Sequence, residues 1–463
     1  MKSFSKLNAL FTIHSSLFTI SFSIILLFSS CSPHIKISRL AKKTILREPS
    51  ATNAFIGISI YDPETKTYLY NHNGDKYFTP ASNTKLFSLY AGMKYLGDSL
   101  PGLRYTIQHD TLYALPTGDP SFLDPEFSYQ PAFELLKNKK LPTIFSNENW
   151  RDEKFGYGWA WDDFRDDYMA ERNAFPVYAN LFDVKQITSM ANNDKIIVSH
   201  PGDMVTYDIQ PAILNKGIHL EESNTKKLAL QRRVSSNEFD LNLGPGRLPN
   251  VFKTPFITNG IGSALEVLND AIPKISKRDS NFTFPLSRFT LLRSVASDSL
   301  FRPMMHRSDN FFAEQTLLMV SNEKLGYMRD EDIIDTLLNL DLKDIPQRPK
   351  WVDGSGLSRY NLFSPQSFIY ILNKLSNEFG RERLFNILPT GGQGTLSSYF
   401  LNDKNAIYAK TGTLSNNCAL SGFIRTNSGK WLIFSILANH YQNGATPIRK
   451  ATERFLEELR KIF

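Results

Sequence analysis

Strand-like segments lie near both ends of this 463-residue chain, with a long stretch of different character between them. Residues 54–61 and 66–70 have the pattern of a β-hairpin around the turn Asp62-Pro63-Glu64. The C-terminal part has three strand-like runs and a closing helix, at 407–410, 418–425, 431–438 and 447–462. This order predicts an α+β fold, in which one antiparallel sheet sandwiched by helices joins the two ends of the sequence.

The chain between these segments divides into parts of different pattern. Apolar residues at helical spacing predict helices over 79–96, 310–325 and 364–379. From about residue 103 to 287 short strand-like runs and Gly- and Pro-containing loops take over. We therefore expect one domain built from residues 51–102 and 288–463, interrupted by a large, mainly β insert over residues 103–287.

The N-terminus has the layout of an export signal. Lys2 and Lys6 precede an apolar run, and the sequence Phe28-Ser29-Ser30-Cys31 resembles a bacterial lipoprotein box. We expect a lipoprotein-type signal peptide over residues 1–30, lipidation at Cys31 and a polar tether over residues 31–50. An uncleaved membrane anchor is the alternative, because residues 7–30 carry no charge. Ten polar residues in that stretch make it a poor spanning helix.

Composition and charge exclude several functions. The net charge of +7 comes from scattered basic residues, so no nucleic-acid-binding surface is expected. Two cysteines cannot form a disulfide framework. The eight histidines include no pair at i,i+4 spacing and no His-Glu-x-x-His motif, so we expect neither a metal site nor another cofactor.

The first of three short motifs is Ser82-Asn83-Thr84-Lys85 at the predicted start of a helix. Residues i and i+3 share a helix face, so the Lys85 amine can lie beside the Ser82 hydroxyl. A serine needs an adjacent base to attack a carbonyl at neutral pH. The alternative is a helix-capping serine followed by a solvated lysine, and Ser-x-x-Lys recurs three more times in the chain.

The second motif is Ser308-Asp309-Asn310, which also precedes an apolar helix and has helix capping as its alternative. The third is Lys410-Thr411-Gly412, followed by Thr413 on a strand-like run. A cation on an edge strand can hold a substrate carboxylate, a threonine can hydrogen-bond it, and a glycine allows close backbone approach. The edge of the strand can also pair with an extended peptide.

In this order the three motifs are the signature of class A β-lactamases and penicillin-binding proteins. The chain resembles the D-alanyl-D-alanine carboxypeptidase/D,D-endopeptidase family, the class C low-molecular-mass penicillin-binding proteins. Ser82 and Ser308 stand 226 positions apart, more than a β-lactamase uses, and a large insert is a hallmark of this family. Further matching stretches are Gly118-Asp119-Pro120, Trp159-Ala160-Trp161-Asp162-Asp163, Asp353-Gly354-Ser355-Gly356-Leu357-Ser358-Arg359 and Gly394-Thr395-Leu396.

The resemblance implies a β-lactamase/transpeptidase-like fold and a serine-type peptidase. Ser82 would be the nucleophile, Lys85 its proton acceptor and Ser308 a proton relay. The implied substrate-binding residues are Asn310, Lys410, Thr411, Gly412 and Thr413. The backbone N–H groups of Ser82 and Thr413 would form the oxyanion hole. For Lys85 to act as a base, burial and a nearby Lys410 charge should lower its pKa.

The implied substrates are peptidoglycan stem peptides ending in D-Ala-D-Ala, and β-lactams would be covalent inhibitors. The implied location is the periplasmic side of a bacterial cell envelope, with a lipid anchor at Cys31. Carboxypeptidase and endopeptidase activity stay open, because both cut a bond that follows D-Ala. A β-lactamase or β-lactam sensor and a non-catalytic wall-binding scaffold are the rival functions.

Two further features are expected to have structural roles. The segment Asp353-Gly354-Ser355-Gly356 is expected to be a tight turn beside the site, because it lacks the Gly-x-Ser-x-Gly spacing of a hydrolase nucleophile. Trp159 and Trp161 can contact sugars or anchor a loop, and we expect anchoring.

Overall fold

The computed structural model describes residues 33–187, 195–200, 203–221, 229–242, 251–273, 277–280, 282 and 284–463. The predicted signal peptide of residues 1–30 and the lipidation site at Cys31 lie outside these residues. In the part of the chain that is described, none of the helices is long and apolar enough to span a membrane.

One five-stranded antiparallel sheet joins the two ends of the chain, as the sequence predicts. Its strands, in spatial order, are β15 (Ile407–Leu414), β16 (Asn417–Arg425), β17 (Trp431–Asn439), β1 (Phe55–Asp62) and β2 (Thr67–His72). β16 and β17 are buried along almost their whole length. Both faces of the sheet are covered by helices, which explains why these strands are continuous apolar runs instead of alternating ones.

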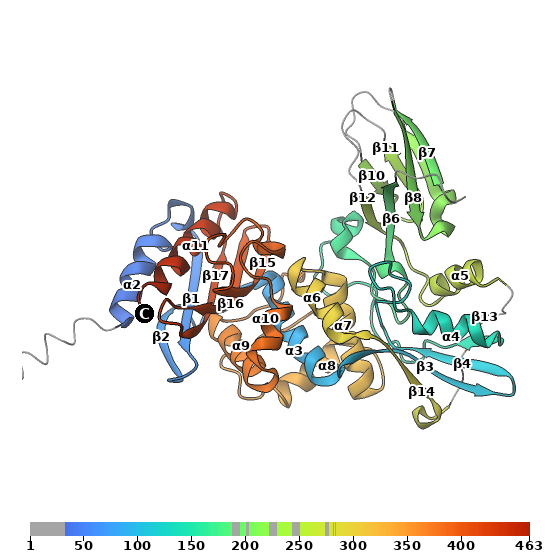
Figure 1. The fold of residues 1–463 in the computed structure, drawn as a ribbon, viewed down its shortest axis with the longest axis horizontal. Coiled ribbons are helices and arrows are strands. Elements are labelled where there is room, and N and C mark those ends of the chain that lie inside the picture. The colour runs from blue at the N-terminus through green and yellow to red at the C-terminus, as the bar shows by residue number, and fades with distance from the viewer. Residues whose placement is uncertain are drawn as a thin grey trace, which may run out of the picture.

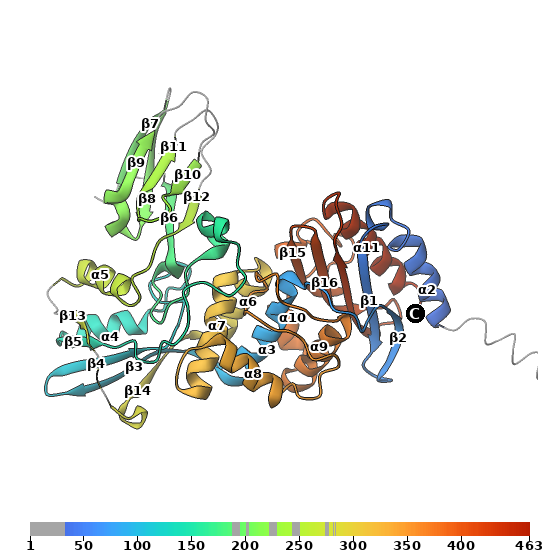
Figure 2. The same cartoon turned by 180° about the vertical axis from the view of Figure 1, so that it is seen from behind.

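Helices form a layer on each face of this sheet. α2 (Pro33–Thr44) and α11 (Thr446–Arg460) cover the face turned away from the insert (Figures 1 and 2). The other face is covered by α3 (Lys85–Tyr95), α6 (Ser297–His306), α7 (Asn310–Leu325), α8 (Asp330–Asn339), α9 (Pro365–Phe379) and α10 (Arg381–Ile387). These six helices lie between the sheet and the insert (Figure 1), and they share one hydrophobic core with the sheet.

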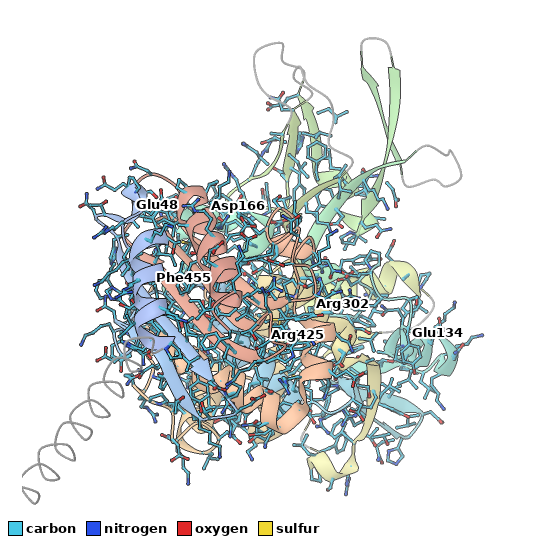
Figure 3. All side chains as sticks on the ribbon, turned by 60° about the vertical axis from the view of Figure 1, so that its left-hand side comes forward. Glu48, Glu134, Asp166, Arg302, Arg425 and Phe455 are labelled. Carbon is cyan, nitrogen blue, oxygen red and sulfur yellow. The ribbon has the colours of Figure 1, made fainter. Side chains whose placement is uncertain are left out.

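The amphipathic pattern of the helices matches their position. α11 turns one apolar stripe to the sheet, with Phe455 fully buried in its middle (Figure 3). α7 is different, because every residue from Asn310 to Asn322 is buried. A helix that is buried all round is a core helix, so the polar side chains of α7, which belong to six of these thirteen residues, are held inside the protein.

The described residues of the insert form three small sheets. The first has the order β13 (Lys277–Asp279), β5 (Thr143–Phe145), β4 (Thr111–Pro116), β3 (Ser99–Gln108) and β14 (Thr290–Ala296). The others are β12 (Val251–Pro255), β6 (Leu181–Ile187), β8 (Asp203–Gln210), β7 (Lys195–His200), and then β10 (Ala229–Arg232), β11 (Phe239–Asn242), β9 (Ile218–Glu221). Two helices, α4 (Pro131–Lys139) and α5 (Gly262–Ala271), pack beside them.

The predicted border after residue 102 falls inside β3, and the border before residue 288 falls just ahead of β14. These two strands pair with each other and form the connection between the insert and the helical layer.

The predicted tether over residues 31–50 is wrong from Pro33 onward. Residues 33–44 form α2, and Ile37, Ala41 and Ile45 are fully buried against the core that α11 shares with the sheet. These three residues recur at i, i+4 and i+8, which places them on one helix face. The segment is polar on average, but this single apolar stripe is enough to dock it.

Replacing Ile37 by Ala should therefore lower the free energy of unfolding by about 2–5 kcal/mol, because a buried methylene-rich side chain is lost and a cavity remains. Denaturant unfolding of the variant measures this loss. Lys36→Ala is the matched control, because Lys36 is the exposed neighbour on the same helix. Equal stability of both variants and the wild type would instead support the prediction that this segment is a tether.

Candidate active site

The three motifs meet at the edge of the sheet. Ser82 lies in a 3-10 turn, η3 (Ala81–Thr84), directly before α3, and Lys85 is the first residue of α3. Ser308 and Asn310 stand at the start of α7, and Lys410–Thr413 lie on β15, the edge strand. Segments separated by more than 200 residues in the sequence therefore supply one site.

The Lys85 amine is the centre of the site. It is fully buried, and its Nζ lies 3.0 Å from Ser82 Oγ, 2.6 Å from Asn310 Oδ1 and 2.8 Å from the Ser355 carbonyl oxygen. The alternative of a capping serine followed by a solvated lysine is wrong, because Ser82 caps neither η3 nor α3 and Lys85 has no contact with solvent.

The hydrogen-bond partners fix the orientation of the amine. An ammonium has three N–H donors, and each of them can donate to one of these three acceptors. A neutral amine has two donors and one lone pair, and only the Ser82 hydroxyl has a hydrogen to give to that lone pair. The Ser355 carbonyl only accepts, and Asn310 Oδ1 is fixed as an acceptor because its Nδ2 donates to the Tyr168 carbonyl at 3.0 Å. A neutral Lys85 therefore accepts from Ser82.

The residues of the second motif have two different roles: Asp309 caps a helix, and Ser308 and Asn310 contact the two lysines of the site. The Asp309 carboxylate caps α7 by accepting from the Phe312 N–H at 2.9 Å. Ser308 has φ of 64°, a left-handed conformation that is uncommon for a serine. Its Oγ lies 2.8 Å from Lys410 Nζ, which also donates to the Thr411 carbonyl at 2.7 Å. The strained backbone thus holds the hydroxyl beside a second buried amine.

Gly412 allows β15 to approach η3. A Cβ at this position would lie 2.6 Å from the Pro80 carbonyl oxygen and 3.1 Å from the Asn83 backbone nitrogen. The Asn83 Nδ2 also donates to the Lys410 carbonyl at 3.0 Å. The backbone that approaches Gly412 is thus the protein's own turn η3, which carries Ser82.

The Asp353-Gly354-Ser355-Gly356 segment is a tight turn beside the site, as predicted. The Asp353 carboxylate organises it, accepting from the backbone N–H groups of Gly356 at 2.8 Å and Ser358 at 2.6 Å. From the insert, Trp159 Nε1 donates to the same carboxylate at 2.9 Å. Trp159 therefore anchors the insert to the turn whose Ser355 carbonyl holds Lys85, which agrees with the anchoring expected for it.

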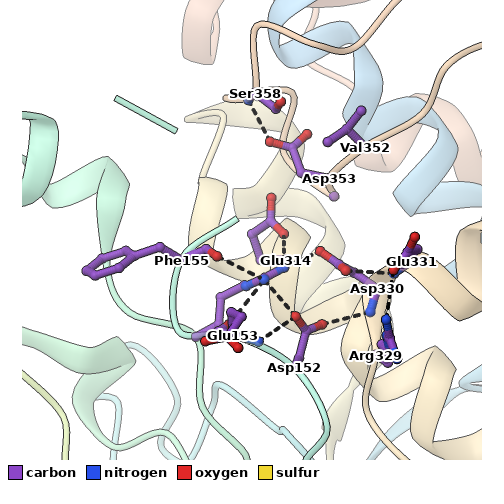
Figure 4. A network of polar contacts seen from close by, with 12 residues as sticks. Asp152, Glu153, Phe155, Glu314, Arg329, Asp330, Glu331, Val352, Asp353 and Ser358 are labelled. Atoms are coloured by element: carbon purple, nitrogen blue, oxygen red, sulfur yellow. Dashed lines mark hydrogen bonds and ion pairs between the residues drawn. The ribbon is translucent and has the colours of Figure 1, made fainter. Parts of the chain in front are cut away.

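A buried ionic cluster supports this turn from below (Figure 4). Glu314 on α7 accepts from the Ser355 N–H at 2.7 Å, and its other oxygen lies 3.3 Å from Arg172 Nη1. Arg172 belongs to the insert and is itself almost fully buried. It also pairs with Asp330 and, at 2.9 Å, with Asp152. The cluster links the insert, α7 and α8 to Ser355, the residue whose carbonyl contacts Lys85.

The chain matches the D-Ala-D-Ala carboxypeptidase 3 (S13) family over residues 40–258 and 285–459. It belongs to this family. It is 24% identical over 458 residues to the D-alanyl-D-alanine carboxypeptidase of Actinomadura sp. (strain R39), covering 87% of this chain and 81% of that one. It is 23% identical over 478 residues to the D-alanyl-D-alanine carboxypeptidase DacB of Haemophilus influenzae, covering 95% and 94%.

The fold also matches a solved structure. The penicillin binding protein 4 (dacB) of Haemophilus influenzae aligns with a TM-score of 0.70 at 19% identity, over 92% of this chain and 99% of that chain. A second structure of the Haemophilus protein, in complex with a β-lactam, aligns with a TM-score of 0.65 at 18% identity, over 92% and 99%. The resemblance drawn from the three motifs is thereby confirmed for both the family and the fold.

Burial dominates the electrostatics of this S13 site. It lowers the pKa of Lys85 to about 8, while the carboxylates of Asp353, Glu314 and Asp309 act in the opposite direction. Burial and then the Lys85 charge hold the pKa of Lys410 well below its ordinary value. The expected effect of burial on the pKa of Lys85 is confirmed. The repulsion between the two amines lowers the pKa of Lys410 instead of that of Lys85.

Burial also raises the pKa of Glu314 to about 7, with a further increase from Asp353, while Arg172 lowers it. Glu314 and Arg172 are two residues beside the site that the sequence did not predict. One signal was present, since Glu314 is an acid inside a strongly apolar helix and stands at i+4 from Asn310. Arg172 gave no local signal, because its partner lies 142 residues away.

The S13 site also has space beside its second motif. A cavity of about 600 Å³ is lined on one side by residues 307–311 and on the other by insert residues such as Asp167, Asp183 and Lys253. Elsewhere, within the described residues, His, Cys, Asp and Glu side chains form no group of three that would hold a metal ion.

Glu314→Gln should lower the pKa of Lys85, because the Glu314 carboxylate raises it. Glutamine keeps an oxygen for the Ser355 N–H, so the position of the Ser355 carbonyl is retained. NMR titration of the labelled lysine amine measures the change against a wild-type pKa of about 8. Glu331→Gln, which alters an exposed acid on α8, is the control. An unchanged Lys85 titration in Glu314→Gln would refute this coupling.

Proposed function

We propose that this protein is a serine-type D-alanyl-D-alanine carboxypeptidase/endopeptidase that cleaves peptidoglycan stem peptides through an acyl-enzyme on Ser82. Membership of the S13 family and the carboxypeptidase names of its relatives support the substrate class. The observation that carries the mechanism is the environment of Lys85, where the lone pair of a neutral amine has only the Ser82 hydroxyl to accept from.

Acylation begins when Lys85 accepts the proton of Ser82. The Ser82 oxygen forms a bond to the carbonyl carbon of the penultimate D-Ala, and the backbone N–H groups of Ser82 and Thr413 stabilise the resulting oxyanion. Collapse breaks the peptide bond, and the proton held by Lys85 passes through Ser308 to the leaving amine. Water then hydrolyses the acyl-enzyme ester and regenerates the Ser82 hydroxyl. Because the pKa of Lys85 is about 8, the neutral, basic fraction of this amine grows as the pH rises toward and through 8.

The remaining motif residues would bind the peptide. The Asn310 amide carries two N–H bonds and gives one to Tyr168, so the other can be offered to a substrate carbonyl. Lys410, Thr411 and Thr413 would receive the carboxylate end, and the edge of β15 would pair with the extended peptide backbone. Gly412 contributes by keeping this edge close to Ser82.

Brief incubation with benzylpenicillin should give a covalent adduct in the wild type and none in Ser82→Ala, because the β-lactam carbonyl is attacked by the same hydroxyl. Intact-mass spectrometry measures the adduct. Ser398→Ala, which removes the hydroxyl of an exposed serine outside the site, is the control and should be acylated like the wild type. A folded wild-type protein without an adduct would favour the wall-binding scaffold, and a short-lived adduct with hydrolysed drug would favour a β-lactamase.

We further propose that the protein is exported as a lipoprotein and faces the periplasm, anchored through a lipid on Cys31. The basic start, apolar run and Ser29-Ser30-Cys31 sequence support this. Globomycin should block maturation and leave a larger precursor, and Cys31→Ala should no longer incorporate labelled palmitate. Ser32→Ala is the matched control. Detection of an unprocessed N-terminus without globomycin would contradict the proposal.

A further inference from the structure

A second cavity lies on the opposite side of β15 from Lys410. It has a volume of about 220 Å³ and is enclosed by β15, the neighbouring strands, the 3-10 turn η9 (Gly394–Leu396) and the first turns of α11. One end of the cavity is apolar, with Leu396, Leu420 and Ile448 in its wall. The other end is polar and reaches the Lys-Thr-Gly motif.

The polar end is built from three hydroxyl groups and a guanidinium. Thr411 Oγ1 lies 2.8 Å from Thr395 Oγ1, and the Arg449 Nη2 donates to Thr413 Oγ1. Thr411 and Thr413 are two of the three residues, with Lys410, to which the proposed function assigns the substrate carboxylate. Arg449 is therefore in direct contact with a hydroxyl that faces that carboxylate.

The charge of Arg449 is available for an anion. It lies in the first turn of α11, where the helix dipole adds to the positive potential and no acidic residue is present. Among the described residues, no carboxylate lies close enough to Arg449 to form an ion pair with it. A guanidinium stays protonated at any physiological pH, so this positive charge is permanent.

Lys410 is less suited to supply that charge. Its amine is fully buried and already donates to Ser308 and to the Thr411 carbonyl. Burial and the nearby Lys85 also hold its pKa well below the ordinary lysine value. A carboxylate placed at Thr411 and Thr413 would have a partly exposed guanidinium on one side and a buried amine on the other.

We propose that Arg449 binds the terminal carboxylate of the leaving D-amino acid, together with the hydroxyl groups of Thr411 and Thr413. This inference rests on the proposed function, because it names a substrate-binding residue for that reaction. A planar guanidinium can form two parallel hydrogen bonds with a carboxylate, which a single lysine amine cannot. Arg449 thereby selects substrates whose leaving group carries a free carboxylate.

The test compares two thioester substrates that share the acyl-D-Ala part. One leaving group ends in a carboxylate and the other in a carboxamide, and both esters are reactive enough to be cleaved without strong binding. Arg449→Gln should lower kcat/KM for the carboxylate substrate about 10- to 100-fold, as expected for a lost hydrogen bond to a charged group. The carboxamide substrate should change less than about twofold, because a neutral amide forms no ion pair with a guanidinium.

Two variants separate direct binding from positioning. Lys450→Gln changes the exposed neighbour on α11 and should leave both substrates unaffected. Arg449→Lys keeps the charge but loses the paired geometry, so it should retain part of the preference for the carboxylate. Equal losses for both substrates in Arg449→Gln would overturn the proposal and reduce Arg449 to a support for Thr413, as would no loss for either.

The proposed function has its own readout in the same experiment. Benzylpenicillin at saturating concentration and long times should label Ser82 in both the wild type and Arg449→Gln, and thermal melting should show that the variant is folded. A wild type that neither forms the adduct nor cleaves the thioesters would refute the function itself. Adduct formation and thioester cleavage without a carboxylate preference would refute only the role of Arg449.

Discussion

The buried amine of Lys85 is the interaction on which the rest of the site depends. Its three acceptors come from η3, from α7 and from the turn after Asp353. All three hydrogen bonds form only when these three segments, which are distant in the sequence, are correctly placed. Removing an ammonium from water costs several kcal/mol unless hydrogen bonds replace the lost solvation. The same burial that makes these contacts necessary lowers the pKa of Lys85 toward the range in which an amine can act as a base.

This requirement explains why the insert is part of the catalytic unit. Arg172 and Trp159, both from the insert, hold Glu314 and Asp353, and these acids hold the two ends of the turn that presents the Ser355 carbonyl. A buried ionic cluster is tolerable only when every member is paired, because one missing partner leaves an uncompensated charge. The base of the insert is therefore coupled to the Lys85 amine through Arg172 and Trp159.

The sequence predicted the elements whose signal is local and long. The apolar runs of β16 and β17 and the periodic helices α7 and α9 were located almost to the residue, and the three motifs identified the family. It did not predict α2, because three apolar residues in a polar segment give only a weak periodic signal. Nor did it predict Arg172 or Arg449 as site residues, because each acquires its partner through tertiary structure alone: Arg172 pairs with α7, and Arg449 with β15.

The edge strand β15 shows how one short motif serves two opposite faces. Lys410 points toward Ser308, whereas Thr411 and Thr413 line the cavity beside α11. Alternation along a strand imposes this division, and a shift of register by one residue would exchange the faces. The pairing of residues 407–414 with β16 along the whole strand prevents such a shift. Gly412 then brings the strand against η3, so register and close approach together place the Lys410 amine on one side of the strand and the two threonine hydroxyls on the other, all beside the turn that carries Ser82.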